Sequence, residues 1–322
     1  MVGCGEPTPP GEAVTFADAN LEAAVREAVA IREGPIYPSD LDGLTSLNAT
    51  EKYITDLTGL EHATSLTELD LGDNYRIHDV SPLANLTNLT ELDLGGNYWI
   101  TDISPLANLT SLTWLGLWGN QISDISSLAN LTSLIWLNLR GNQISDLSPL
   151  ANLTGLTWLG LWANQIGDIS PLTNLTSLTW LGVSFNRISD ISPLASLTGL
   201  TELYLKGNQI SDVSPLANLT SLDDLGLGSN QISDISPLAN LTSLTRLNLQ
   251  DNQISDISPV VNLTSLTWLY LQDNQISNIS PLVDNEGLLG GDEVYLSGNP
   301  LSSDSVNIYI PQLKARGVIV DY

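Results

Sequence analysis

Acidic side chains are the most numerous groups in this sequence that could do chemistry. Glu68, Asp70 and Asp73 are followed by Glu91 and Asp93 in the same arrangement. Hard oxygen ligands of this kind suit Ca²⁺, but no glycine-turned loop with calcium-binding spacing contains them. Acid–base catalysis needs carboxylates held in an enclosed pocket, and an open row does not provide one. We favour a solvated acidic surface over a metal site, and we predict no catalytic residue here.

Other reactive side chains are scarce. The two histidines are His62 and His78, and neither accompanies a serine motif of the nucleophile-elbow type. Cys4 is the single cysteine, so the chain cannot form an internal disulfide or a cysteine-based zinc site. The sequence therefore predicts no enzymatic activity, no cofactor and no metal centre.

Tryptophan offers binding chemistry instead. The chain has eight Trp but only two Phe, and Trp is over-represented among the residues that dominate binding energy at interfaces. Four tryptophans are spaced by 22 residues, and further large or charged residues recur beside them. Duplication of rings that stack for stability is the alternative explanation. We predict a ligand-binding surface made of Trp114, Trp118, Trp136, Trp158, Trp162, Trp180, Phe185, Arg140, Tyr204, Tyr98 and Trp99.

The 22-residue spacing belongs to an internal repeat. From Leu106 the chain reads LANLTSLTWLGLWGNQISDISS, then LANLTSLIWLNLRGNQISDLSP, and about ten such units lie between residues 60 and 281. Leu115 and Leu117 alternate with other residue types, which is the period of a strand. Stacked units place equivalent strands in register as a parallel sheet. The four tryptophans would then form a ladder about 15 Å long at a strand spacing of about 4.8 Å.

Polar columns of the repeat predict structural roles. An asparagine follows every strand, for example Asn120 and Asn164, and we predict that these side chains pair buried backbone groups as a ladder. Ser104-Pro105-Leu106 predicts a serine N-cap with proline at the first helical position. The preceding aspartate column, for example Asp102, predicts turn and cap hydrogen bonds.

Two early repeats, at residues 60–82 and 83–105, contain one extra residue after the asparagine. A one-residue bulge there should push Tyr75, Tyr98 and Trp99 out along one rim without disturbing the leucine core. Duplication of a single insertion is the alternative to a functional rim.

The sequence predicts four segments: a tether at 1–13, a helical N-terminal cap with a half repeat at 14–59, leucine-rich repeats at 60–281 and a C-terminal cap at 282–322. Leu21, Val25 and Val29 share one helical face, with Asn20 as the predicted N-cap. A helix over Ser305–Arg316 and a strand at Val318–Val320 should cover the last edge. Covered edges oppose end-to-end association, so we expect a monomer.

The segment Ile54-Thr55-Asp56-Leu57-Thr58-Gly59-Leu60-Glu61 and the repeats written Asn-Gln-Ile-Ser-Asp-Ile-Ser-Pro-Leu-Ala-Asn-Leu-Thr resemble bacterial leucine-rich-repeat proteins of the internalin type. The resemblance covers about residues 14–281. It implies a leucine-rich-repeat, right-handed curved solenoid with a parallel β-sheet on the concave face, 3₁₀ or short helical turns on the convex face and an α-helical N-terminal cap. It also implies a surface-exposed binding role without specifying the ligand.

The net charge of the chain limits its partners, and its first residues predict its cellular location. The formal net charge is −26, from 36 acidic and 10 basic residues, which excludes a nucleic-acid partner held through its phosphates. Met-Val-Gly-Cys-Gly at the start resembles the end of a bacterial lipoprotein signal and predicts lipidation of Cys4, with Gly5–Gly11 as a short tether. A soluble secreted protein and a cytosolic protein are the alternatives. Membrane contact would come only through this lipid anchor.

These observations predict a non-enzymatic binding protein of the bacterial cell envelope, located at the cell surface or outside the cell. We expect it to hold a protein or peptide on the concave, tryptophan-rich face. Carbohydrate, which can stack on aromatic rings, is the alternative ligand. A structural adhesive or spacer is the second alternative function.

Overall fold

The computed structural model describes residues 11–322, so the predicted tether residues 1–10 and the lipidation of Cys4 lie outside the described residues. The described residues form two compact units, which divide between Leu134 and Ile135. Their boundary falls inside the run of repeats, where the sequence analysis predicted no division. The four segments predicted from the sequence stay a prediction.

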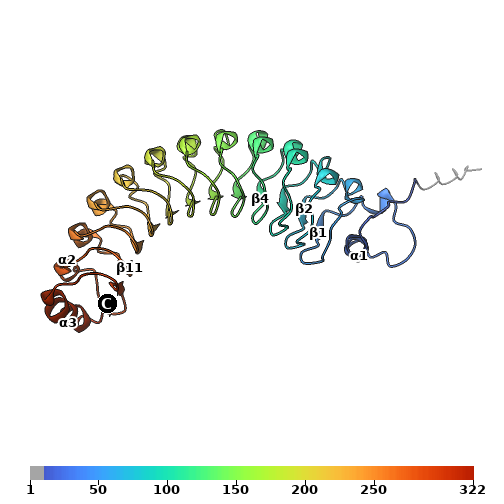
Figure 1. Cartoon of the computed structure of the whole chain (residues 1–322). Helices are drawn as coiled ribbons and strands as arrows, with labels where there is room; N and C mark the ends of the chain where they lie inside the picture. Colours follow the sequence, from blue (N-terminus) through green and yellow to red (C-terminus); the bar gives the residue numbers. More distant parts are fainter. Residues whose placement is uncertain (1–10) are drawn as a thin grey trace, which may run out of the picture. The chain divides into compact units, whose positions relative to one another are not determined.

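Among residues 11–134, the first unit contains one α-helix and four strands, and Figure 1 shows the strands one after another along the chain. Its strands pair in parallel and in register, so that Ser46, Glu68, Glu91 and Trp114 are successive partners. Short 3₁₀ helices connect the strands, as the repeat predicted. The elements are α1 (Ala19–Ala28), η1 (Pro38–Asp40), β1 (Ser46–Asn48), η2 (Leu60–His62), β2 (Glu68–Asp70), η3 (Ser81–Leu83), β3 (Glu91–Asp93), η4 (Ser104–Asn108), β4 (Trp114–Gly116) and η5 (Ser126–Asn130).

The second unit contains nine strands, again parallel and in register. Its strands are β5 (Trp136–Asn138), β6 (Trp158–Gly160), β7 (Trp180–Gly182), β8 (Glu202–Tyr204), β9 (Asp224–Gly226), β10 (Arg246–Asn248), β11 (Trp268–Tyr270), β12 (Glu293–Tyr295) and β13 (Ile319–Asp321). Its 3₁₀ helices are η6 (Ser148–Leu150), η7 (Ser170–Asn174), η8 (Ser192–Ser196), η9 (Ser214–Leu216), η10 (Ser236–Asn240) and η11 (Ser258–Asn262).

The end of the second unit differs from its repeats. α2 (Ser280–Asp284) replaces a 3₁₀ turn, and a π-helical turn at Ser305–Tyr309 runs into α3 (Ile310–Ala315) (Figure 1). β13 then pairs with β12. The predicted terminal helix and strand are therefore present, and β12 is a strand that the sequence analysis missed. Among residues 11–322, no helix is both long and apolar enough to span a membrane.

The core of each unit is built from the leucine and isoleucine columns of the repeat. Leu115 and Leu117 in the first unit, and Leu159 and Leu161 in the second, are fully buried. Burying apolar surface contributes about 25 cal/mol per Å², so these columns supply the main stabilisation of every repeat. Strand residues on the opposite face of the sheet, here called the open face, are left to interact with solvent or a ligand.

The asparagine column forms the predicted ladder. Asn164 Nδ2 donates to the carbonyl oxygens of Leu139 and Leu161 at 3.0 and 3.1 Å, and its Oδ1 accepts from the backbone N–H of Ile144 at 3.0 Å. These bonds join neighbouring repeats and satisfy buried backbone groups, whose loss costs about 1–3 kcal/mol each.

Two capping predictions need correction. Asp18, not Asn20, caps α1, because its Oδ1 accepts from the backbone N–H groups of Asn20 and Leu21. Ser104 is the first residue of η4 and does not cap it with its side chain. Asp102 Oδ1 accepts from the Ser104 N–H at 2.8 Å instead. The aspartate column thus does the turn chemistry predicted for it, and this hydrogen bond lowers the pKa of Asp102.

Candidate ligand-binding face

A stack of three indole rings lies on the open face of the second unit. Trp136, Trp158 and Trp180 start the adjacent strands β5, β6 and β7 and are register partners. The ring centroids of Trp136 and Trp158 are 4.4 Å apart and those of Trp158 and Trp180 are 4.2 Å apart, with interplanar angles of 15° and 12°. The rings therefore stack face to face. We call these three residues the tryptophan stack.

Glycines make room for these rings on the sheet. A Cβ added at Gly160 would lie 2.7 Å from the Trp158 ring, and one at Gly182 would lie 2.7 Å from the Trp180 ring. Because glycine has no side chain, these positions leave space on the sheet beside the tryptophans. The indoles fill that space themselves, so each ring is only half exposed and its position is fixed by the backbone beneath it.

Other predicted residues join the stack within the second unit. Trp162 lies 5.7 Å from Trp180 and 6.0 Å from Tyr204 between ring centroids, and the Arg140 guanidinium lies 5.5 Å from the Trp162 ring. Phe185, in the turn that follows β7, is 56% exposed. The structure thus gathers Trp136, Trp158, Trp162, Trp180, Arg140, Tyr204 and Phe185 on one surface.

A hollow of about 330 Å³ follows this aromatic surface along the sheet. Its lining comes from strands β8 to β11 and from the turns that follow β6, β7 and β8. We call it the Tyr204 hollow. It is lined by Trp162, Ser184, Phe185, Tyr204, Lys206, Asp224, Gly226, Arg246, Asn248 and Tyr270.

A polar cluster holds one wall of the Tyr204 hollow in place. The Tyr204 hydroxyl lies 2.7 Å from Glu202 Oε2 and 3.0 Å from Asp224 Oδ2, and it can donate its one proton to either carboxylate. Burial, followed by the hydrogen bond to Glu202, raises the pKa of Tyr204, so the hydroxyl stays protonated. Arg246 Nη1 lies 3.5 Å from Asp224 Oδ2, and its guanidinium lies 4.8 Å from the Trp268 ring. Burial also raises the pKa of Asp224.

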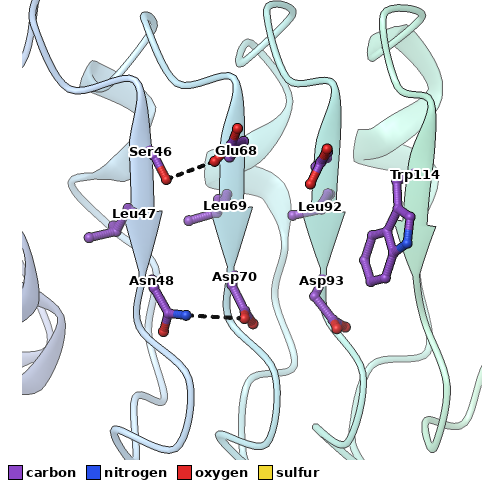
Figure 2. A pocket seen from close by; sticks show the side chains of 10 residues that line it. Ser46, Leu47, Asn48, Glu68, Leu69, Asp70, Leu92, Asp93 and Trp114 are labelled. Atoms are coloured by element: carbon purple, nitrogen blue, oxygen red, sulfur yellow. Dashed lines mark hydrogen bonds between the residues drawn. The ribbon is translucent and has the colours of Figure 1, made fainter.

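The first unit has a different hollow, of about 240 Å³, on its own open face. Figure 2 shows that Glu68, Asp70 and Asp93 line it from successive strands and that Trp114 stands at one side. Ser46 Oγ donates to Glu68 Oε2 at 3.0 Å. Burial raises the pKa of Asp93, and the charges of Asp70 and Asp73 raise it further. The hollow has no Lys, Arg or His side chain in its lining.

The acidic residues of this first-unit hollow are not gathered around one point. Among residues 11–322, no three His, Cys, Asp or Glu side chains are grouped so that they could hold a metal ion.

Trp118, predicted as a binding residue, lies close over Gly95, where a Cβ would overlap its indole. Trp114 and Trp118 thus belong to the first unit, whereas the tryptophan stack belongs to the second.

An aromatic rim marks the two longer repeats of the first unit. Tyr75, Tyr98 and Trp99 are 37%, 50% and 60% exposed, while the neighbouring core residues Ile77 and Ile100 are fully buried. The extra residue therefore bulges outward, as expected. Tyr53, which the sequence analysis did not select, extends the rim: it is 71% exposed and its ring lies 6.4 Å from that of Tyr75. The Tyr75 and Tyr98 rings stack at 5.6 Å.

Four residues of the Tyr204 hollow were not predicted from the sequence: Lys206, Asp224, Arg246 and Tyr270. A signal for them was present in the aligned repeats. The second outward strand position carries Tyr204 and Tyr270 but glycine at Gly226 between them. A missing side chain between two large ones predicts a gap on the sheet surface.

One short parallel strand, one 3₁₀ turn and one ladder asparagine per repeat define a leucine-rich-repeat protein. The family described as Leucine Rich repeats (2 copies) matches residues 64–108, 110–152, 132–174, 176–218, 198–240 and 220–262. No curated protein matches the chain significantly.

Solved structures show which leucine-rich-repeat proteins this chain resembles. An internalin (inlF) from Listeria monocytogenes is 42% identical with a TM-score of 0.88, and the match covers 94% of this chain and 88% of that one. An internalin C2 (inlC2) from the same organism is 34% identical with a TM-score of 0.52, over 80% of this chain and 97% of that one. The PEPR1–AtPEP1 structure is 27% identical with a TM-score of 0.65, over 79% of this chain and 42% of that one.

This chain belongs to the internalin-type family of bacterial leucine-rich-repeat proteins. The resemblance inferred from the repeats is thereby confirmed, as is the leucine-rich-repeat solenoid fold. Proteins with this fold mediate protein binding, and the family is one of non-enzymatic binding proteins.

Proposed function

We propose that this chain is a non-enzymatic binding protein of the bacterial cell envelope that holds a protein or peptide on the open face of its second unit. The observation that supports this most is the tryptophan stack, extended by Trp162 and Tyr204. Stacked indoles on a hydrogen-bonded sheet are ordered before a ligand arrives. Binding then loses little conformational entropy at these side chains, and Trp is a frequent hot-spot residue.

The geometry of the stack favours a protein or peptide over a carbohydrate. A sugar ring stacks on an open aromatic face, but both faces of Trp158 are covered, one by Trp136 and the other by Trp180. Only the apolar edge of the Trp158 ring is left for a ligand to contact. Such an edge suits packing against the apolar side chains of a partner. Carbohydrate binding remains the second candidate for the more exposed rings, such as Phe185 at 56%.

The envelope location rests on family membership. Internalin-type relatives are surface or secreted proteins, and we propose the same placement here. Attachment through a lipid on Cys4 is part of the proposal and rests on the sequence Met-Val-Gly-Cys-Gly. Mass spectrometry of the protein isolated from its native membrane fraction tests it. An unmodified cysteine would remove the anchor and leave a secreted protein.

Selection from a library of random 12-residue peptides displayed on phage tests the binding proposal. The full chain should select peptides whose affinity falls roughly thirtyfold or more when Trp136 and Trp158 are both replaced by Ala, since hot-spot truncations cost about 2 kcal/mol or more. Asn152→Ala with Asn174→Ala is the matched control, because both asparagines are exposed on the 3₁₀ side of the same unit.

The control variant should bind the selected peptides like the wild type, and circular dichroism should show that both variants fold. Equal losses in the two double variants would show that the open face is not the binding surface. Selection of no peptide at all, combined with binding to a glycan array that depends on Phe185, would favour the carbohydrate alternative.

A further inference from the structure

The Tyr204 hollow is a gap in a row of large side chains. Along the second outward strand position, Tyr204 on β8 and Tyr270 on β11 flank Gly226 on β9 and Asn248 on β10. The face of Tyr270 on the far side of the hollow is stacked on Tyr295, with ring centroids 4.9 Å apart and an interplanar angle of 5°. Tyr204 is fixed by Glu202 and Asp224. Both walls are therefore held in place, and the volume of about 330 Å³ suits one large side chain.

The charges of this hollow are not equivalent. Arg246 is engaged by Asp224 and stacks on Trp268, and Asp224 in turn is satisfied by Arg246 and Tyr204. Lys206 is different, because it is half buried and, in the described part of the chain, no carboxylate lies within ion-pairing distance of its ammonium group. The lining carries two cations and one carboxylate, although the chain as a whole has a net charge of −26.

We propose that the Tyr204 hollow binds an acidic side chain, Asp or Glu, of the protein or peptide held on the open face, with its carboxylate on the Lys206 ammonium and its methylene groups against Tyr204. This inference rests on the proposed function and adds a specificity determinant to it. The tryptophan stack supplies apolar contact area, and Lys206 selects for charge.

Charge complementarity argues for an acidic occupant over a basic one. A Lys or Arg side chain entering the hollow would meet Lys206 and Arg246, and like charges in a half-buried site repel strongly. An acidic side chain supplies the ion-pair partner that Lys206 lacks. A hydrogen bond between charged groups contributes more than one between neutral groups. The hollow should therefore bind a carboxylate with higher affinity than an amide of the same shape.

A double-mutant cycle tests the pairing. A peptide from the phage selection in which a Glu is enriched at one position is synthesised with its C-terminus amidated. A second peptide has Gln in place of that Glu. Lys206→Met should weaken the Glu peptide roughly tenfold to a hundredfold and leave the Gln peptide nearly unchanged. Lys206→Glu should shift the selection from acidic to basic peptides. Lys314→Met, which removes the same charge outside the hollow, is the matched control.

Filling the hollow gives an independent readout. Gly226→Asn places a side chain on its floor without changing any charge, and equivalent strand positions already carry asparagine at Asn138 and Asn248. We expect this variant to fold and to lose the preference for Glu over Gln peptides. Circular dichroism and the melting temperature verify the fold.

The outcomes separate this inference from the proposed function. If the library yields no binding peptide, the proposed function fails, and this inference fails with it. Peptides that depend on Trp158 but lose the same affinity with Lys314→Met as with Lys206→Met would overturn the inference alone. The inference would also be overturned if the affinity losses from Lys206→Met and from the Glu-to-Gln change in the peptide were additive. Two groups in direct contact give a combined loss that differs from the sum of the single losses. Binding of uronic-acid glycans in place of peptides, lost with Lys206→Met, would reassign the hollow to carbohydrate.

Discussion

The repeats of the first unit and those of the second share a sequence pattern but not the same hydrogen bonding. In the second unit, Asn164, Asn186 and Asn208 each accept from an isoleucine N–H of the preceding repeat. In the first unit, Asn97 and Asn120 have a buried Oδ1 with no hydrogen-bond partner among the described residues. The repeats that precede these two asparagines are the ones that contain an extra residue. An insertion that leaves the core intact still breaks one bond of the ladder.

The insertions also place strained residues on the surface. Tyr75 and Tyr98 have φ of 67° and 65°, in the left-handed region that disfavours side chains with a Cβ. Such strain is often found at functional positions. Left-handed residues also occur in the turns of the regular repeats, for example Ala163 and Phe185, so Tyr75 and Tyr98 add to this strain in the first unit, whereas the second unit keeps a regular ladder beneath its tryptophan stack.

The two open faces differ in charge as well. The first-unit hollow is acidic and has no cation in its lining, whereas the Tyr204 hollow has Lys206 and Arg246 beside one carboxylate. The same strand-and-turn repeat thus carries hollows with differently charged linings. Because strand side chains alternate between the two faces, the open face can vary without any change in the leucine core.

The largest effect is expected from the ladder of the second unit. Asn164→Ala removes hydrogen bonds to Leu139, Leu161 and Ile144 and should lower the free energy of unfolding by about 1–3 kcal/mol. Asn97→Ala should cost roughly 1 kcal/mol less, because the Oδ1 of Asn97 has no partner to lose. Urea unfolding followed by circular dichroism measures both, and equal losses would contradict the difference between the units.

A smaller effect is expected from shortening a long repeat. Deletion of Tyr98 should let Asn120 accept a backbone N–H as in the regular repeats and should remove one left-handed residue. The free energy of unfolding should rise by about 1 kcal/mol. Thermal unfolding measures the change, with deletion of Gln143 from a regular repeat as the control that should destabilise. A loss of stability on deleting Tyr98 would mean that the bulge contributes to the fold.

The smallest effect concerns the acidic hollow of the first unit. Asp70 and Asp93 are direct register partners, and like charges in such pairs destabilise by about 0.2–1 kcal/mol. Asp93→Asn should therefore stabilise the chain at pH 7 while keeping an oxygen for the Gly95 N–H.

The pH dependence of this substitution checks its cause. The pKa of Asp93 is raised in the folded chain, mainly by burial, so the folded state binds the proton more readily than the unfolded state. The destabilisation from Asp93 is thus fully present above the raised pKa and disappears as the pH falls towards the unfolded value of about 3.9. The gain from Asp93→Asn should shrink in urea unfolding at pH 4. A gain that is constant with pH would assign it to packing.

Several elements could be predicted from the residues because they are local properties of the repeat. The alternation around Leu115 and Leu117 predicted the strand, and the Asn120 column predicted the ladder. The insertion at Tyr98 predicted an outward bulge. The capping residue of α1 was mispredicted as Asn20, because both Asp18 and Asn20 are good caps in sequence. Only the hydrogen bonds of Asp18, including one to Thr55 in another segment, decide between them.

The sequence by itself determined the repeat, the buried columns and the family, because each depends on one residue type recurring every 22 positions. Only the tertiary structure decided how side chains from different strands meet. The indole of Trp158 lies over Gly160 and between two other rings, and Tyr204 turns towards Glu202 and Asp224. Those directions depend on the side chains of neighbouring strands, which a column of aligned residues does not specify. The hollow beside Lys206 exists for the same reason: Gly226 has no side chain, and the rings of Tyr204 and Tyr270 stand on either side of the space that it leaves.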